Sequence, residues 1–350
     1  MKAVAAIVAW VLATGTGFAG VAGAGEVRCG DVITVDTRLH GDVGPCSSGG
    51  LVVGGDGIRL DLNGHSVFGM ADMGDGVGIS VIGRSGVVVT NGTVSHFDAG
   101  VYIEGGGYNR LSHLSVQDNI SSAQAHLSPD GTLSFGDGVV LNSDHNLIDH
   151  NNIVHNGPND GIGVFANSGH NTIRGNVVTD NDVRAGPGPS FDDGIRLESG
   201  AHDNRIVGNI VEGNGRSGIA VFAYGSGNVV RTNAVRRNGF TGGGNQSGIG
   251  RGDGIRLYPG STGTQVRNND VFANRADGIR VDGQSNMITR NRTGGNGTGG
   301  RGYDLHDGNR RPPCDNNVWR ANTFSRGRPD CVKGPPGGSA GLNSPARAVR

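Results

Sequence analysis

Near the end of this chain, side chains that can transfer protons or neutralise charge recur at a fixed interval. They are Arg256, Tyr258, Arg280, Asp282, Asp304 and His306. Each arginine can neutralise a carboxylate, and an imidazole or a phenol can move a proton. This combination fits chemistry at the carbon next to a sugar carboxylate. The arginines would neutralise the carboxylate, His306 or Tyr258 would transfer protons, and the aspartates would orient them.

These residues belong to a short strand pattern that recurs along the chain. The pattern Asp-Gly-apolar-x-apolar opens at residues 56, 75, 98, 137, 160, 193, 253 and 277, and a serine opens the copy at 217. A degenerate copy at 301–305 closes the series. Uninterrupted copies lie 23 or 24 residues apart, and the apolar runs are too short for helices.

Three columns of asparagine lie between these strands, five residues apart. The columns are Asn146, Asn171, Asn204, Asn228, Thr264 and Asn286; Asn151, Asn176, Asn209, Asn233, Asn269 and Asn291; and Asn156, Asn181, Asn214, Asn238, Asn274 and Asn296. We expect Asn and Gly at the bends, because both tolerate positive φ, and we expect stacked Asn side chains to hydrogen-bond along each column. The repeat predicts an all-β, right-handed parallel β-helix solenoid with about ten coils of three strands, as one domain over residues 25–332.

Composition agrees with a solenoid. A hydrophobic content of 35% with 67 glycines would suggest disorder in an ordinary domain, but a solenoid needs few inward residues per strand. A leucine-rich repeat fits less well, because the third segment lacks helix-forming residues. The net charge of −1 argues against nucleic acid as a partner. After the N-terminus, no segment is apolar enough to span a membrane.

Strand alternation places one set of polar and aromatic residues on the outer face of the first strands. One outward column contains Arg196, Arg256, Arg280 and Asp304, and its neighbour contains Phe165, Glu198, Phe222, Tyr258, Asp282 and His306. We interpret Phe165, Arg196, Glu198 and Phe222 as substrate-binding, since aromatic rings stack on sugars and guanidinium groups pair with carboxylates. Two other interpretations stay open. One is that loops cover the aromatic rings, and the other is that the charged residues form only an ion-pair ladder.

Insertions at 119–136, 182–192 and 239–252 always precede a first strand. Loops at that position would build a wall beside the same face. Their Gly-Pro-Gly-Pro (186–189) and Gly-Gly-Gly (242–244) segments are typical of loops that can move.

The two ends of the chain have their own signatures. Residues 1–24 read as a secretory signal peptide with Lys2, an apolar stretch and a small-residue cleavage site, which predicts a secreted or periplasmic protein. Cys29 and Cys46, and Cys314 and Cys331, are each 17 residues apart, and in an exported protein we expect two disulfides that staple the terminal caps. Zinc binding by these cysteines is the alternative to disulfides. Residues 333–350 have the composition of a disordered tail.

The strand and asparagine repeats of residues 50–325 resemble those of the pectate-lyase-like superfamily of right-handed parallel β-helix proteins. Membership would imply any of several functions, among them polysaccharide lyase, glycoside hydrolase, mannuronan epimerase, phage tailspike and NosD-type periplasmic protein. The segment from Gly302 to Asp307 also resembles the Asp-Pro-His catalytic segment of mannuronan C5-epimerases, with Leu305 in place of proline. Fold alone does not choose among these functions.

Two sets of residues in the sequence are of types that bind metal ions. The Asp that opens each strand fits either calcium binding between coils or capping of a turn, and the second is favoured because Asp accepts backbone N–H bonds. His145, His150, His155 and His170 are expected at different columns, so no transition-metal site is predicted.

Our leading hypothesis is a secreted protein that binds an acidic polysaccharide along the first-strand face. No cofactor is expected, and calcium stays open as a bound ion. If it is an enzyme, lyase or C5-epimerase chemistry is favoured. A non-catalytic glycan-binding or surface protein is the second hypothesis, and a NosD-like metal-delivery partner is the third. The sequence leaves the substrate and the oligomeric state open.

Overall fold

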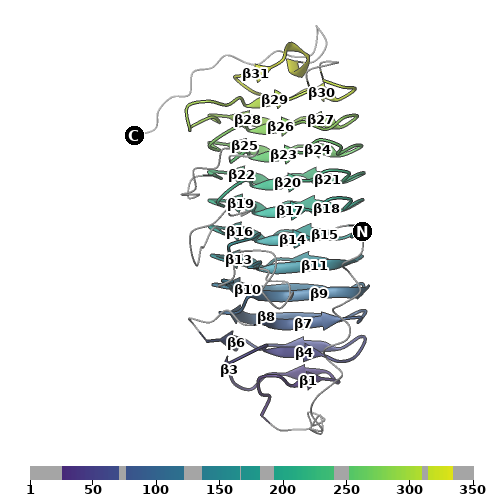
Figure 1. Ribbon diagram of the computed structural model, residues 1–350, viewed down its shortest axis with the longest axis vertical. Helices are drawn as coiled ribbons and strands as arrows, with labels where there is room; N and C mark the ends of the chain where they lie inside the picture. The colour runs from purple at the N-terminus through teal and green to yellow at the C-terminus, as the bar shows by residue number, and fades with distance from the viewer. Residues whose placement is uncertain are drawn as a thin grey trace, which may run out of the picture.

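The computed structural model describes residues 26–70, 76–121, 136–165, 167–181, 193–239, 252–309 and 314–333. These residues form an all-β rod in which successive coils stack along one axis (Figure 1). The expected signal peptide, nearly all of the expected tail and most of the three insertions lie outside the described residues. The only helical element among the described ones is the short 3-10 helix η2 (Asp330–Lys333).

One parallel sheet of 12 strands runs the length of the rod and is called the first-strand sheet below. Its strands are β1 (Val32–Ile33), β4 (Leu51–Val53), β7 (Val77–Ile82), β9 (Ala99–Gly107), β11 (Val139–Asp144), β14 (Ile162–Val164), β17 (Ile195–Leu197), β20 (Ile219–Val221), β23 (Ile255–Leu257), β26 (Ile279–Val281), β29 (Leu305–Asp307) and β31 (Gly327–Arg328). Figure 1 shows them stacked from β1 at one end to β31 at the other.

Two further parallel ladders complete each coil and join at the long strands β8 (Val88–Ser95) and β10 (Arg110–Gln117). One ladder contains β2 (Thr37–Arg38), β5 (Arg59–Asp61), β12 (Leu147–Asp149), β15 (Thr172–Arg174), β18 (Arg205–Val207), β21 (Val229–Arg231), β24 (Gln265–Arg267), β27 (Met287–Thr289) and β30 (Val318–Arg320). The other contains β3 (Val43–Cys46), β6 (Ser66–Gly69), β13 (Asn152–Val154), β16 (Val177–Thr179), β19 (Ile210–Glu212), β22 (Ala234–Arg236), β25 (Asp270–Phe272) and β28 (Arg292–Gly294). The predicted parallel β-helix with three strands per coil is confirmed.

The core is a continuous stack of aliphatic side chains from all three ladders. In the coil that begins at β17, Ile195 and Leu197 of the first strand and Ile206 and Val211 of the next two are all fully buried. Each three-residue strand thus buries one or two residues, and only neighbouring coils cover them. This arrangement explains how a chain with so few hydrophobic residues forms a core.

The asparagine columns form hydrogen-bonded ladders through the interior. Asn171 is fully buried, and its Oδ1 accepts bonds from both the backbone N and the Nδ2 of Asn146. Its own Nδ2 donates to the carbonyl of Ser143, and its backbone N donates to Asn204. Each Asn therefore satisfies buried backbone groups that the short strands leave unpaired at the bends.

The expectation that the column asparagines themselves adopt positive φ is wrong. The residue before each one does, as at His170 (φ 58), Gly175 (φ 63) and Asp180 (φ 54). The bend is made by that left-handed residue, and the following Asn caps the bend from inside. Tyr108, His145 and His170 occupy this position in consecutive coils, and their rings stack 4.7 and 4.8 Å apart. His145 and His170 thus share a column, contrary to the sequence-based expectation.

Both predicted disulfides are present. Cys29 pairs with Cys46 and Cys314 pairs with Cys331, with Cα–Cα distances of 5.5 and 6.4 Å. At the C-terminal end, Trp319 is buried and donates its Nε1–H to Asp307 in the last coil. Among the residues that the structure describes, no helix is long and apolar enough to cross a membrane.

Candidate functional site on the first-strand sheet

The register of the first-strand sheet brings the predicted charged residues together. Arg196 pairs with Ala220, Ala220 with Arg256, and Arg256 with Arg280 in consecutive parallel strands. Adjacent parallel strands lie about 4.8 Å apart, so side chains distant in sequence become direct neighbours. The predicted superposition of coils is therefore confirmed for these positions.

The predicted alignment of the last coil is wrong by two residues. His306, not Asp304, pairs with Arg280, and Leu305 pairs with Ile279. A shift of two residues leaves every side chain on the same face of a strand, so alternation alone could not reveal the error. His306 therefore joins the arginine column rather than the column of Asp282.

Asp304 does not contribute to the outer face. It is 1% exposed, and its Oδ1 accepts bonds from the backbone N and the Nδ2 of Asn296. Its Oδ2 accepts bonds from the backbone N–H groups of Ser325 and Arg326. Asp304 thus ends the third asparagine column, and its carboxylate is not available for the predicted catalytic role at the outer face.

Arg256 lies at the centre of an ion-pair network. Its Nη1 is 2.9 Å from Asp253 Oδ2, and its Nη2 is 2.6 Å from Asp282 Oδ2. The same Asp282 oxygen lies 3.1 Å from Arg280 Nε. The side chain of Arg256 is only 2% exposed, so its charge is already neutralised inside the protein and is poorly placed to receive a substrate carboxylate.

Arg196 forms a second, similar network nearer the middle of the rod. It lies 2.8 Å from Glu198 and 3.8 Å from Asp160, and its side chain is 10% exposed. Burial raises the pKa of Asp160, although the charge of Arg196 opposes this shift. Burial also raises the pKa of the neighbouring Asp137 to about 8, while a hydrogen bond from the Asp160 backbone lowers it in part. Burial thus favours the protonated form of both carboxyl groups.

The aromatic residues of the face pack against these arginines. Phe222 and Tyr258 stack with their ring centroids 4.2 Å apart, and the guanidinium carbons of Arg196 and Arg256 lie 3.9 and 4.4 Å from the two rings. Tyr258 is 7% exposed, and its hydroxyl accepts a hydrogen bond from Arg216 at 2.7 Å. Burial raises the pKa of Tyr258 well above its usual range, so the phenol is a poor base.

Phe165 belongs to a separate apolar cluster. It is half-buried and packs against Ala99, Tyr102 and Val140 of the earlier coils. Tyr258 is buried by the arginines and Phe222, whereas Phe165, Phe222 and Glu198 are all partly exposed. The alternative that loops cover the aromatic rings concerns insertions that lie mostly outside the described residues.

The C-terminal end of the sheet contains the accessible part of the site. His306 Nδ1 lies 2.6 Å from Asp277 Oδ2, and the side chains are 20% and 6% exposed. Arg280, with 32% of its side chain exposed, lies 3.6 Å from the same Asp277 oxygen. Tyr303 flanks the imidazole at 5.2 Å between ring centroids. When the Nδ1–H donates to Asp277, the other imidazole nitrogen is left with a lone pair for proton transfer.

Sequence reasoning missed the carboxylates that hold the arginines. Asp253 and Asp277 open their strands, and each lies three residues before the arginine that it binds. Their backbone role was predicted correctly: Asp253 Oδ1 accepts the N–H of Asp277, and Asp277 Oδ1 accepts that of Tyr303. One oxygen thus caps the turn, and the other faces the outer surface, where it meets a guanidinium group. The recurring Asp-Gly-x-Arg spacing is the signal that could have revealed these pairs.

The chain is thus a parallel β-helix with ion-paired residues at the C-terminal end of its first-strand sheet. The family described as "Right handed beta helix region" matches residues 49–235 and 130–318. The chain belongs to this right-handed β-helix family, which confirms the handedness and the resemblance inferred from its repeats. The comparison with curated protein sequences found no match.

Several solved structures share the fold at low sequence identity. The Dettilon tailspike protein aligns with 14% identity over 86% of this chain, with a TM-score of 0.57, but this chain spans only 55% of the tailspike. Pectate lyase Pel9A aligns with 16% identity over 89% of this chain and 80% of the lyase (TM-score 0.51). An alginate lyase from Paenibacillus sp. FPU-7 aligns with 15% identity over 86% of this chain and 90% of the lyase (TM-score 0.51).

Proposed function

We propose that this protein acts on a carboxylated polysaccharide at the C-terminal end of the first-strand sheet, by lyase or C5-epimerase chemistry. The observation that carries the proposal is the hydrogen-bonded pair of His306 and Asp277 beside the partly exposed Arg280. His306 would remove the proton next to the sugar carboxylate, and Arg280 would bind that carboxylate. Asp277 would act as a positioning residue that fixes the imidazole.

The buried part of the face takes a different role in this proposal. Arg256 and Tyr258 would support the site from below rather than contact the sugar, because their polar groups already bind Asp253, Asp282 and Arg216. Asp282, 12% exposed, would hold Arg280 in place. Phe222 and Glu198 lie further along the same face and would contact a polymer that extends beyond the reacting sugar, while Arg196 would hold Glu198 in place.

Similarity to the solved structures of pectate lyase Pel9A and the Paenibacillus alginate lyase supports the proposal at the level of the fold. Disulfides at both ends fit an oxidising compartment, and we propose that the protein is exported and meets its glycan there.

The direct experiment is to incubate the purified protein with alginate, pectate and glycosaminoglycans, with and without calcium. A lyase produces an unsaturated uronate, which is followed by ultraviolet absorbance, and an epimerase is followed by NMR of the polymer. His306→Gln should lower turnover by about 10²- to 10⁴-fold. A matched control is His155→Gln, because His155 pairs with Asp118 at 2.5 Å on an exposed turn of another ladder. Undiminished activity in His306→Gln would refute the proposed role of this site.

A second candidate is a non-catalytic glycan-binding protein, which the self-neutralised arginines favour. In that case the polymer would bind without turnover, and Phe222→Ala together with Arg280→Ala would weaken its affinity. Affinity electrophoresis in gels that contain each polymer separates the two candidates. Retardation without product formation would support binding alone.

A further inference from the structure

A cluster of two histidines and one aspartate lies on a turn away from the first-strand sheet site. His170 and Asp203 occupy equivalent positions in consecutive coils, each immediately before a column asparagine and each with positive φ (58 and 52). His202 precedes Asp203 and is bridged to Gly169 and Ser226 of the neighbouring coils. The cluster therefore joins two coils whose backbones are tied together, including the bond from His170 N to the carbonyl of His202.

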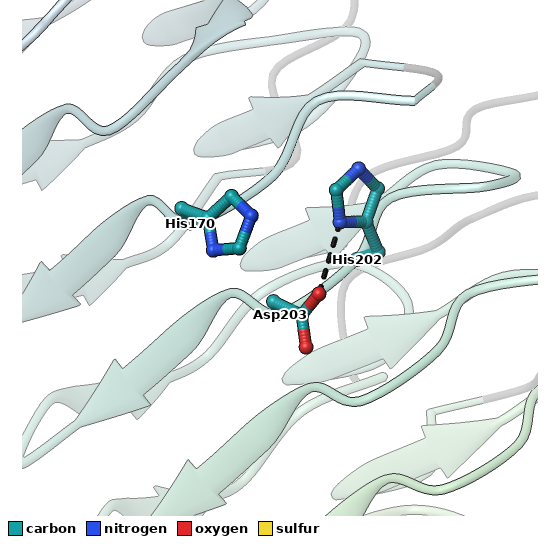
Figure 2. Close-up of side chains that lie close together, drawn as sticks. All are labelled: His170, His202 and Asp203. Carbon is teal, nitrogen blue, oxygen red and sulfur yellow. Dashed lines mark hydrogen bonds and ion pairs between the residues drawn. The ribbon is translucent and has the colours of Figure 1, made fainter.

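The three side chains face a common space. Figure 2 shows the two imidazole rings and the carboxylate directed toward one another, with a hydrogen bond between His202 and Asp203. One ligand atom from each residue can be chosen so that all three lie within 4.8 Å of one another. The rings of His170 and His202 are nearly perpendicular, at 87°, with centroids 5.4 Å apart. Among the described residues, this is the one group of three or more such ligands.

The distances suit a small transition-metal ion. His202 Nδ1 and Asp203 Oδ2 are 3.2 Å apart. Two atoms bound to one tetrahedral zinc at about 2.0 Å lie about 3.3 Å apart, so this pair needs no rearrangement. For tetrahedral bonds of about 2.1 Å, every pair of ligand atoms must come within about 3.4 Å, so the separations of up to 4.8 Å in the cluster must shorten on binding. Rotation of partly exposed side chains allows this movement, and coordination by Nδ1 would displace its proton.

Neighbouring glycines make room for two of the ligands. A Cβ atom at Gly169 would lie 2.4 Å from the ring of His202, so the imidazole rests where any larger residue would clash. A Cβ atom at Gly227 would lie 2.4 Å from Asp203 Oδ1. On the opposite side, the ring of His145 stacks on His170 at 4.8 Å. The two glycines thus leave space for the imidazole of His202 and the carboxylate of Asp203, and the stack with His145 orients the ring of His170.

We propose that His170, His202 and Asp203 form a binding site for a divalent transition-metal ion such as zinc, nickel or copper. Two imidazole nitrogens and one carboxylate oxygen are ligands that these metals accept. Three protein ligands leave a coordination position open for water or for a group of a bound molecule. The site is independent of the glycan proposal, because it lies on a different turn of the coil and shares no residue with the His306 pair.

Isothermal titration of tag-free protein with zinc chloride, in a buffer that does not bind metals, tests the proposal. We expect one zinc ion per chain. Loss of a second-shell partner commonly weakens a metal site about 10- to 100-fold, so loss of a direct ligand in His170→Gln, His202→Gln or Asp203→Asn should cost at least about tenfold. Visible absorption of the cobalt-substituted protein provides a second readout, which the same variants should abolish.

The control variant is again His155→Gln, which removes an exposed histidine from a His–Asp pair that has no second imidazole ligand beside it among the described residues. It should bind zinc like the wild type. Circular dichroism checks that every variant is folded. Absence of zinc binding to the wild type at 100-fold excess of metal would overturn the proposal, as would equal affinity in wild type, His170→Gln and His202→Gln.

Discussion

His306 Nδ1 lies 2.6 Å from Asp277 Oδ2, although 29 residues separate them in the sequence. The pair exists because β26 and β29 are adjacent parallel strands and because Asp277 opens the coil below. Asp277 Oδ1 is meanwhile fixed by the backbone N–H of Tyr303. A carboxylate held by the backbone in this way keeps the imidazole in one orientation.

If the pair performs proton transfer, the two partners should differ in their kinetic effect. His306→Gln should lower kcat by about 10²- to 10⁴-fold, the usual contribution of a general base. Asp277→Asn retains the acceptor for Tyr303 and should lower kcat by at least about tenfold with little change in KM. Steady-state kinetics on a responsive polymer measure both values. An effect of Asp277→Asn on KM alone would contradict the positioning role.

Arg256→Met should strongly destabilise the fold. It leaves Asp253, whose side chain is 2% exposed, without its cation, and breaking a buried pair from one side costs about 3–5 kcal/mol. The control is Arg292→Met, because Arg292 and Asp270 are 66% and 56% exposed and such pairs contribute at most about 1 kcal/mol. Urea denaturation gives both free energies of unfolding. Equal losses in the two variants would show that burial of the pair is unimportant.

The asparagine ladder predicts a position-dependent cost. Asn209→Ala removes the acceptor for two N–H groups of Asn176 and the donor to the carbonyl of Ile173. Each unsatisfied buried group costs about 1–3 kcal/mol, so the variant should lose several kcal/mol. Asn152→Ala, at an exposed strand position, should change stability by no more than about 0.5 kcal/mol. A small effect at residue 209 would mean that water replaces the ladder bonds.

The buried acid Asp137 predicts how stability depends on pH. Burial raises its pKa from 3.8 to about 8, so the folded state favours the protonated carboxyl. Its stabilising contribution is complete below pH 3.8 and is lost as pH rises toward 8. Asp137→Asn should therefore have a higher Tm than the wild type at pH 8. Each kcal/mol gained in the free energy of unfolding raises Tm by about 2–4 °C. Calorimetric scans from pH 4 to 8 check this, and parallel curves for the two proteins would contradict it.

Much of the architecture could be predicted because the repeat is local. The Asn-x-apolar-x-x-Asn spacing fixes two short strands and two bends, and the ladder from Asn171 to Asn204 follows directly from it. The positions of Arg256, Arg280, Tyr258 and Asp282 on one face followed from strand alternation. Their proximity did not require knowledge of the loops.

The remaining features depended on contacts between coils that the pattern does not encode. The register of the last coil differs by two residues from the predicted one. Asp304 takes the place of a column asparagine there, because a carboxylate accepts the same bonds as an amide oxygen. The burial of Tyr258 results from Arg216 and the two arginine networks, which involve side-chain geometry rather than sequence period. Outward orientation therefore did not imply exposure.

The interval between successive members of the first column varies widely, while the bond between them stays nearly constant. Asn146 reaches Asn171 across 25 residues, and Asn171 reaches Asn204 across 33, with N–Oδ1 distances of 2.8 and 3.0 Å. Thr264 reaches Asn286 across 22 residues at 2.9 Å. The scaffold thus accommodates segments of very different length between coils, which makes those junctions suitable places to graft foreign peptides or to vary specificity by insertion.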